Sequence, residues 1–180
     1  NRLSMLVDKV LKLSMFEKQQ TELKYEYFDI KKLAAEVIDS MALQFEKAKA
    51  KVNLHSSGNQ FLIRADQLHI TSVLYNLLDN ALKYSKEKPV IDVSISCNDD
   101  ECMLKVKDNG IGIPAEFKHR IFEKFFRVPT DNRHNIKGYG LGLSYVAHIV
   151  QQHHGTINLY SEPGDGSEFT IKLPLIHEEN

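Results

Sequence analysis

Two asparagines and a lysine lie on one face of a predicted helix. In the segment 66–85, Asn76, Asn80, Lys83 and Tyr84 fall within one arc of about 100°, and apolar residues occupy the opposite side. Asparagine is a mediocre helix former, so two of them beside a lysine suggest a polar role. Amide oxygens can complete the coordination shell of Mg²⁺, and a lysine can meet a phosphate. A solvated helix face would produce the same pattern.

A glycine-containing turn, DNGIGIP at residues 108–114, directly follows a predicted strand. Gly110 and Gly112 would let the backbone turn sharply and come close to a flat ligand that a Cβ would hold off. Asp108 could accept a hydrogen bond from an exocyclic amine and would reject ligands that lack this donor. A plain glycine-rich turn is the alternative, because a single Gly-x-Gly is weak evidence.

A second glycine-rich segment, GYGLGLS at residues 138–144, opens a helix predicted over 141–153. Amides at a helix N-terminus, approached through glycines, bind phosphate through unpaired N–H groups and the helix dipole. The segment is not a Walker loop, because no Gly-Lys-Ser/Thr follows. It also misses the dinucleotide fingerprint, which needs an early strand-to-helix turn in a parallel sheet.

An aromatic and basic stretch separates the two glycine segments. It contains IFEKFFR at residues 121–127 and a polar loop between Pro129 and Gly138. Six lysines or arginines and two acidic residues between Lys118 and Lys137 give a local net charge of +4. This composition is typical of a mobile lid, and equally of a disordered surface loop.

The composition favours one ordinary soluble domain. The 180 residues are 42% hydrophobic and 26% charged, which excludes a disordered chain, and the net charge of −1 provides no global basic field for nucleic acid. No apolar run approaches the ~18–20 residues of a membrane span, and no signal peptide is recognisable. The chain starts at Asn1 rather than Met, so we expect a fragment of a longer protein.

Helices and strand pairs intermix along the chain. We predict an α+β fold, a two-layer α/β sandwich in which a mixed, mostly antiparallel sheet carries helices on one face. Two of the strands, 52–55 and 61–64, are expected to form a hairpin around the turn at 56–59. The helices are expected over about 1–20, 30–50, 66–85 and 141–153, and the other strands over 27–30, 90–96, 103–107, 156–161 and 168–173.

The first 20 residues are predicted to form a helix. Apolar residues recur at heptad spacing between Leu3 and Leu13, which predicts an amphipathic helix that needs a partner. This helix either packs on its own domain or forms half of a helical hairpin that dimerises.

Cys97 and Cys102 flank a predicted turn, and we expect both to be reduced strand residues in a cytosolic protein.

Four segments, taken in their order, resemble a known family. NLLDNALKYS, DNGIGIP, IFEKFFR and GYGLGLS resemble the asparagine, first glycine, phenylalanine and second glycine boxes of two-component sensor histidine kinases. These kinases belong to an ATPase superfamily with chaperone, topoisomerase and mismatch-repair members. The resemblance covers roughly residues 25–175. It implies a catalytic ATP-binding domain over 23–177, preceded over 1–22 by the second helix of the dimerisation and phosphoacceptor hairpin.

Carried over position by position, the resemblance implies a site for ATP and Mg²⁺. Asn80 would coordinate Mg²⁺, with Asn76 beside it at the phosphates, and Asp108 would read the adenine amine. Tyr139 departs from the small residue expected between the first two glycines of its box. The other implied ATP-binding residues are Lys83 and Arg127 toward the phosphates, Tyr84 near the base or ribose, Gly110, Gly112 and Ile113 in the first glycine box, Phe122 at the ATP lid, and Gly138, Gly140, Leu141, Gly142 and Leu143 around the triphosphate. Phe125 and Phe126 would anchor the lid together with Phe122.

No histidine fits the phosphoacceptor pattern of this family, which is a His followed by an acidic residue with a Pro a few positions on. Only His177 precedes an acid, Glu178, and no Pro follows it. We therefore expect the phosphoacceptor, and the acid beside it that acts as catalytic base, on a preceding helix outside this chain. The chain itself would bind ATP without phosphorylating itself.

The resemblance implies the cytoplasmic part of a homodimeric, membrane-bound sensor. ATP would phosphorylate a His of its dimerisation domain, and the phosphoryl group would pass to an Asp of a response regulator. One alternative is a superfamily ATPase or protein serine kinase that regulates a partner; the N-terminal helix together with the phenylalanine box favours the histidine kinase. The other is a non-catalytic nucleotide-binding or dimerising module, against which the intact Asn80, Asp108 and glycines weigh. No nucleic-acid partner is expected.

Overall fold

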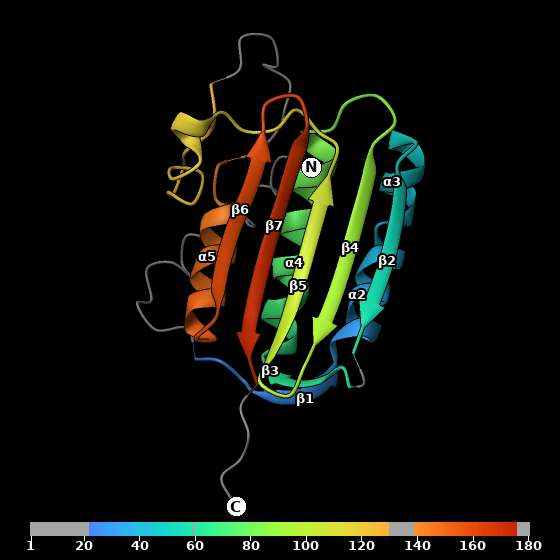
Figure 1. Cartoon of the computed structure of the whole chain (residues 1–180), viewed down its shortest axis with the longest axis vertical. Coiled ribbons are helices and arrows are strands. Elements are labelled where there is room, and N and C mark those ends of the chain that lie inside the picture. The colour runs from blue at the N-terminus through green and yellow to red at the C-terminus, as the bar shows by residue number, and fades with distance from the viewer. Residues whose placement is uncertain (1–21, 59, 130–138, 176–180) are drawn as a thin grey trace, which may run out of the picture.

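The computed structural model describes residues 22–58, 60–129 and 139–175 (Figure 1). The helix predicted over 1–20, most of the polar loop before Gly138, Gly138 itself and His177 lie outside these residues. The described helices are α2 (Ile30–Ser40), α3 (Ala42–Ala48), α4 (Gln67–Lys83), the 3₁₀-helix η1 (Ala115–Phe117) and α5 (Gly142–Gln152). The described strands are β1 (Glu26–Asp29), β2 (Lys51–Ser57), β3 (Leu62–Ala65), β4 (Val90–Cys97), β5 (Glu101–Asp108), β6 (Thr156–Glu162) and β7 (Gly166–Pro174).

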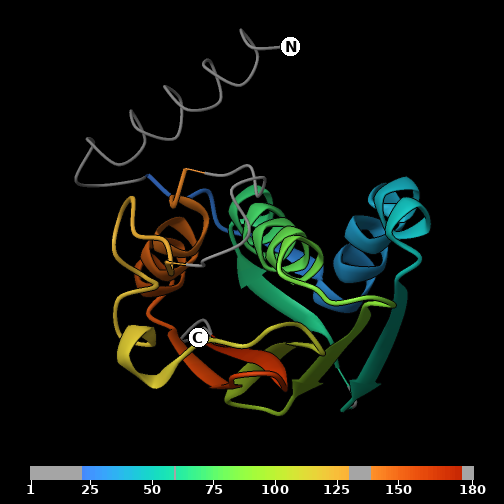
Figure 2. The same cartoon turned by 90° about the horizontal axis from the view of Figure 1, so that it is seen from above.

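The described residues form a five-stranded sheet with the order β2-β4-β5-β7-β6. β2 runs parallel to β4, and the other neighbours in this sheet are antiparallel. The helices lie together on one face of the sheet, so the molecule has two layers (Figure 2). This arrangement confirms the predicted sandwich with a mixed, mostly antiparallel sheet.

Helix α4 lies at the centre of the core. It is preceded by Asp66, whose side chain accepts a hydrogen bond from the His69 N–H and caps the first turn. α4 packs against β5 and against the neighbouring helices α2 and α5. Its buried residues recur at helical spacing, while β4 and β5 alternate buried and more exposed residues, so both elements turn an apolar face to the same interior.

Two local predictions were wrong. The strands 52–55 and 61–64 do not form a hairpin, because β2 pairs with β4 and β3 pairs with β1. Ile63 of β3 lies opposite Phe28 of β1 in the register, and both are buried in the core, so burial decides the partner of β3. The helix predicted over 30–50 is divided into α2 and α3 at the buried Met41.

The cysteines also differ from the prediction. Cys97 and Cys102 form a disulfide, with their Cα atoms 4.1 Å apart. They are direct partners in the antiparallel β4–β5 register, on either side of the turn. Opposite residues of such a pair come close enough to be bonded, and this register is not visible in the spacing of the two cysteines.

None of the helices within the described ranges is both long and apolar enough to cross a membrane.

Truncation of Leu78 tests the central place of α4. Leu78 is completely buried, so Leu78→Ala is expected to lower the free energy of unfolding by about 2–5 kcal/mol through lost burial and a new cavity. Urea unfolding followed by circular dichroism measures this change. Leu68→Ala is the matched control, because Leu68 lies on the same helix with 71% of its surface exposed, and its effect should stay within about 0.5 kcal/mol. Equal effects of the two substitutions would contradict the described packing.

Candidate functional site

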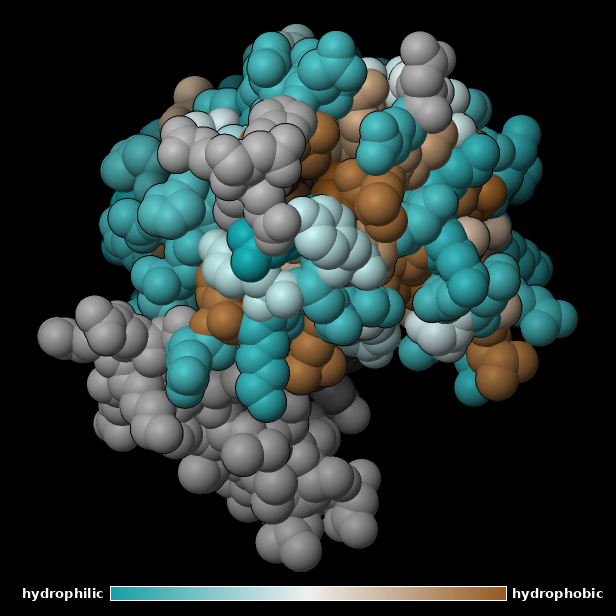
Figure 3. All heavy atoms as spheres, turned by 90° about the horizontal axis from the view of Figure 1, so that it is seen from below, coloured by the Kyte–Doolittle hydropathy of each residue, from teal (hydrophilic) through white to brown (hydrophobic). Residues whose placement is uncertain are grey.

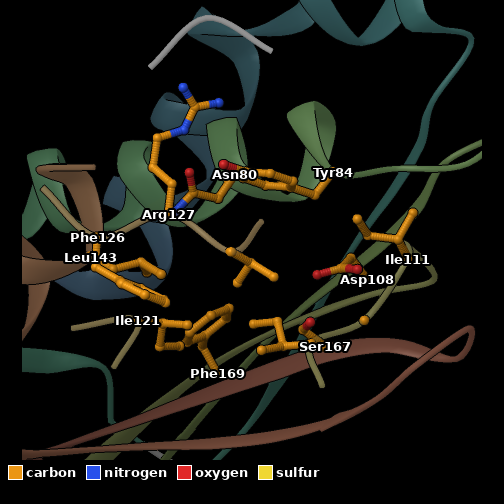
Figure 4. A pocket seen from close by; sticks show the side chains of 13 residues that line it. Asn80, Tyr84, Asp108, Ile111, Ile121, Phe126, Arg127, Leu143, Ser167 and Phe169 are labelled. Atoms are coloured by element: carbon orange, nitrogen blue, oxygen red, sulfur yellow. The ribbon is translucent and has the colours of Figure 1, made fainter. Parts of the chain in front are cut away.

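A cavity lies between the C-terminal half of α4, the end of β5, the start of β7 and the segment that follows η1 (Figure 4). One wall carries polar side chains, and the opposite side carries mostly aliphatic and aromatic ones (Figure 4). The lining residues are Asn80, Tyr84, Asp108, Ile111, Gly112, Ile113, Ile121, Phe126, Arg127, Val128, Leu143, Ser167 and Phe169.

Asp108 is the acidic group of this cavity. It is the last residue of β5, and in the register it lies opposite Ser167 of β7. The Gly110 N–H donates to Asp108 Oδ1 at 2.7 Å, which orients the carboxylate. Burial raises the pKa of Asp108, and hydrogen bonds from the backbone N–H groups of Gly110 and Ser167 offset only part of this rise. A carboxylate that has lost part of its hydration gains from a ligand that donates a hydrogen bond.

The glycines after β5 are required by close contacts within the protein. Gly112 has φ +71°, and a Cβ there would come within 1.9 Å of the Glu162 carbonyl oxygen. A Cβ on Gly110 would lie 2.6 Å from the Tyr84 carbonyl oxygen. Contacts this short exclude any side chain. The segment is thereby held between the end of α4 and the β6–β7 turn, and Gly112 still lines the cavity.

The hydroxyl of Ser161 joins the same segment to the start of β7 by hydrogen bonds. Ser161 Oγ accepts a hydrogen bond from the Ile113 N–H at 2.9 Å and donates to the Gly166 carbonyl at 2.7 Å. Ser167 Oγ lies 2.9 Å from Ser161 Oγ and acts as the donor, since the Ser161 proton is already engaged. Ser167 therefore stands beside Asp108 with its hydroxyl oxygen fixed.

The apolar side of the cavity combines aliphatic residues with two phenylalanines. Phe169 of β7 lines it, and Phe122 packs edge-on against the Phe169 ring, with centroids 6.4 Å apart. Phe126 also lines it, with the Arg120 guanidinium 4.2 Å from its ring centroid. Phe125 is 54% exposed and contributes through its backbone, because its N–H donates to the Gly140 carbonyl at 2.9 Å.

The polar side joins α4 to the first turn of α5. A Cβ on Gly142 would lie 2.9 Å from Asn76 Oδ1 and 4.0 Å from Asn80 Nδ2, so both amides face the start of α5. Asn76 is held in place by a hydrogen bond from its Nδ2 to the Ser72 carbonyl at 2.7 Å. The Asn80 side chain points into the cavity, and Arg127 lies near it (Figure 4).

The structure separates the predicted site residues into three groups. Asn80, Tyr84, Asp108, Gly112, Ile113, Phe126, Arg127 and Leu143 line the cavity. Asn76, Gly110, Phe122, Gly140, Leu141 and Gly142 do not line it but lie in the adjoining segments, where Gly140 has φ +70° and packs on the backbone of Phe125 and Phe126. Lys83 does not line it and forms an ion pair with Asp79 one turn earlier on α4.

Sequence reasoning missed part of the lining. Ile111, Ile121, Val128, Ser167 and Phe169 were not expected at a site, yet all line the cavity. The alternation of β7 places Ser167 and Phe169 on one face, which was the available signal. That this face meets Asp108 depends on the pairing of β7 with β5, and no local pattern encodes this pairing.

Known proteins share this sequence and fold. The profile of the family described as "Histidine kinase-, DNA gyrase B-, and HSP90-like ATPase" matches residues 65–177. The sensor protein RprX of Bacteroides fragilis is 42% identical over 180 residues, which are 99% of this chain and 35% of RprX. The sensor histidine kinase WalK of Bacillus subtilis is 33% identical over 180 residues, 99% of this chain and 29% of WalK. The chain thus spans about a third of these curated relatives.

Solved structures agree with this assignment. The catalytic domain of histidine kinase ThkA superimposes with a TM-score of 0.75 at 26% identity, covering 85% of this chain and 99% of that domain. The structure of full-length ShkA in complex with AMPPNP gives a TM-score of 0.85 at 27% identity, covering 99% of this chain and 37% of ShkA. The chain therefore belongs to the family of histidine kinase-, DNA gyrase B- and HSP90-like ATPases, within which it is a catalytic domain homologous to those of sensor histidine kinases.

Proposed function

We propose that the cavity binds Mg–ATP and presents its γ-phosphate to a histidine of the sensor kinase to which this domain belongs. The observation that carries the proposal is the pairing of a partly buried carboxylate, Asp108, with the Asn80 amide of α4 across one cavity. A carboxylate selects a ligand with an exocyclic amine, and adenine carries one. Apolar residues such as Ile113 and Phe169 suit the faces of a base.

The polar side of the cavity suits the phosphates. The first turn of α5 offers backbone amides at the positive end of the helix dipole, and Arg127 brings a cationic side chain to the same region. Gly142 lets Asn76 approach this turn closely, as the contact distance of a Cβ there indicates. Negative charge on the triphosphate would thus meet fixed dipoles and a guanidinium, which lowers the cost of transferring a phosphoryl group.

Asn80 is the proposed magnesium ligand. Among the described residues, no group of three or more His, Cys, Asp or Glu is arranged to hold a metal ion. A single amide oxygen suits Mg²⁺ when phosphates and waters complete its oxygen shell, so the donor set fits an ion that arrives with ATP. The bound ion would neutralise charge on the phosphates.

We also propose the reaction that the full-length kinase carries out with this site. Catalysis in the domain is mainly positioning, because the attacking nucleophile is a histidine nitrogen supplied by a dimerisation domain. We assign residues 1–22 to the second helix of that domain and 23–177 to the ATP-binding domain. The phosphohistidine would then pass its phosphoryl group to an aspartate of a response regulator. The sensor kinase identity of the relatives supports both partners, as well as a homodimeric parent protein.

Removal of the Asn80 amide tests the magnesium assignment. Asn80→Ala is expected to weaken Mg–ATP binding about tenfold, corresponding to roughly 1.4 kcal/mol, and to leave binding of ATP without Mg²⁺ nearly unchanged. Calorimetric titration of this chain with ATP, in Mg²⁺ and in EDTA, measures both. Asn158→Ala, at an exposed position of β6, is the control. Equal losses with and without Mg²⁺ would show that Asn80 acts on the nucleotide and not on the ion.

Substitution of Asp108 by asparagine is expected to affect the free energy of unfolding and the affinity for ATP in different directions. The folded-state pKa of Asp108 lies above the usual 3.8. Its contribution to the free energy of unfolding therefore falls as the pH rises from 3.8 to the folded-state pKa, and stays low above it. Asp108→Asn keeps an oxygen acceptor for the Gly110 N–H and removes this cost.

We therefore expect Asp108→Asn to be at least as stable as the wild type in urea at pH 7, with an advantage that disappears below pH 3.8. With the amide oxygen bonded to the Gly110 N–H, the N–H₂ group of the asparagine would face the exocyclic amine of adenine, which is also a donor. ATP affinity should therefore fall by at least about tenfold. Full ATP affinity in this variant would remove Asp108 from the site. A variant less stable at pH 7 than the wild type would contradict the burial cost.

A further inference from the structure

A second polar cluster lies at the ends of α4 and α5 that are remote from the cavity. Its centre is Asp66, which is buried and precedes the first residue of α4. One carboxylate oxygen, Oδ1, accepts from the His69 N–H at 3.0 Å and caps the helix. The other, Oδ2, accepts from the Lys24 N–H at 2.8 Å. The backbone N–H of Asp66 donates to His153 Nε2 at 3.0 Å.

His153 closes this cluster from the C-terminal end of α5. A backbone N–H can only donate, so Nε2 is an acceptor and the ring proton lies on Nδ1. Nδ1 is 2.8 Å from the Ile149 carbonyl and donates to it. Burial lowers the pKa of His153, and His69 and His154 lower it further, against the opposite effects of the Ile149 hydrogen bond and Asp66. The buried ring is thus neutral, and both its nitrogens are paired.

The segment that enters the domain lies against both residues. Tyr25 stacks at a tilt on the His153 ring, with centroids 5.5 Å apart, and its hydroxyl is 3.5 Å from the Gln152 carbonyl. The Arg64 guanidinium lies 5.7 Å from the Tyr25 ring centroid. In Figure 1 this segment, drawn in blue, runs beneath the lower end of α5 before it reaches β1. Figure 3 views the molecule from this end, where hydrophilic side chains surround smaller apolar areas.

A helix cap needs only part of this arrangement. Asp29, which caps α2, bonds the Lys32 N–H through Oδ1 at 2.9 Å, and this satisfies the first turn. Asp66 makes the equivalent bond and has a second oxygen directed at the chain 42 residues earlier. His153 adds a bond from a third part of the sequence. The extra bonds join Lys24 and Tyr25 to the same two helices that carry Asn80 and Gly142.

We propose that Asp66 and His153 are positioning residues, which clamp the segment at Lys24 and Tyr25 and so set the direction in which the chain enters the ATP-binding domain. The consequence for phosphoryl transfer rests on the proposed function. Delivery of the γ-phosphate to a histidine of another domain requires a defined relative orientation, and a small misplacement is costly. The clamp fixes that orientation relative to α4 and α5.

The test uses a variant that removes the clamp and keeps the cap. Asp66→Ser retains one side-chain oxygen for the His69 N–H and loses the second acceptor for the Lys24 N–H. Asp29→Ser is the matched control, because it makes the same change at a cap without the second bond. His153→Phe removes the acceptor of the Asp66 N–H and keeps a ring, whereas His153→Gln can restore an acceptor near the position of Nε2.

Amide hydrogen exchange of this chain, measured by NMR, reports the clamp directly. In Asp66→Ser and His153→Phe, the Lys24 amide should exchange at least about tenfold faster, while the Val106 amide of β5 keeps its rate. Asp29→Ser and His153→Gln should leave Lys24 close to wild type. An unchanged Lys24 amide in Asp66→Ser, or equal acceleration at Lys24 and Val106, would overturn the clamp.

Autophosphorylation of the full-length kinase tests the consequence. Asp66→Ser is expected to lower the maximal rate about tenfold with the KM for ATP unchanged, because nucleotide binding is intact and orientation is lost. A wild-type rate in a variant with a released Lys24 amide would overturn the positioning role. If the wild-type chain itself failed to bind Mg–ATP by calorimetry, the proposed function would fail, and hydrogen exchange at Lys24 would still decide on the clamp.

Discussion

The burial of one face of α4 against the five-stranded sheet is the constraint on which the rest of the structure depends. Leu74, Leu77 and Leu78 are almost completely buried, so the helix cannot rotate without exposing them. This fixes the direction of its other face. Asn76 and Asn80 then point toward the first turn of α5, and Tyr84 at the C-terminal end closes over the segment that follows β5.

The position of Asp108 links the free energy of unfolding of the domain to the proposed recognition of a ligand. Its surroundings partly bury this carboxylate, and the two backbone N–H groups that bond it do not fully replace its lost hydration. The apo domain therefore carries a group whose ionised form is disfavoured. A ligand that donates a hydrogen bond relieves this cost, and a ligand without a donor does not. Under the proposed function, selectivity for an amine-bearing base follows from the same partial burial that disfavours the ionised carboxylate.

Two helices connect the cavity with the point where the chain enters the domain. α4 carries Asn80 in its C-terminal half and is preceded by Asp66, while α5 begins at Gly142 and is followed by His153. A bond made at one end of such a helix restricts the position of the other end, since the helix moves as a rigid body. The entering segment and the proposed nucleotide site therefore share their supports, as the proposed transfer to a histidine of another domain requires.

The local sequence predicted most of the secondary structure, but not the partners of every strand. The helix of Asn76 and Asn80, the turn after Asp108 and the helix that follows Gly140 were all predicted, because helical spacing and glycine act over a few residues. The hairpin expected at 56–59 was wrong and α2 was predicted too long, because partner strands and helix breaks depend on burial.

The sequence by itself determined the types of chemical group in this domain and their order, and hence the resemblance to histidine kinases. Only the tertiary structure decided which of them meet. The register of β5 with β7 brought Ser167 to Asp108, and the register of β4 with β5 brought Cys97 to Cys102. The packing of α4 beside α5 brought Asp66 to His153. These contacts form only when the apolar faces of the elements are buried against one another. Because the hydrophobic effect is non-directional, the apolar face of a single short segment does not specify which other segment it packs against.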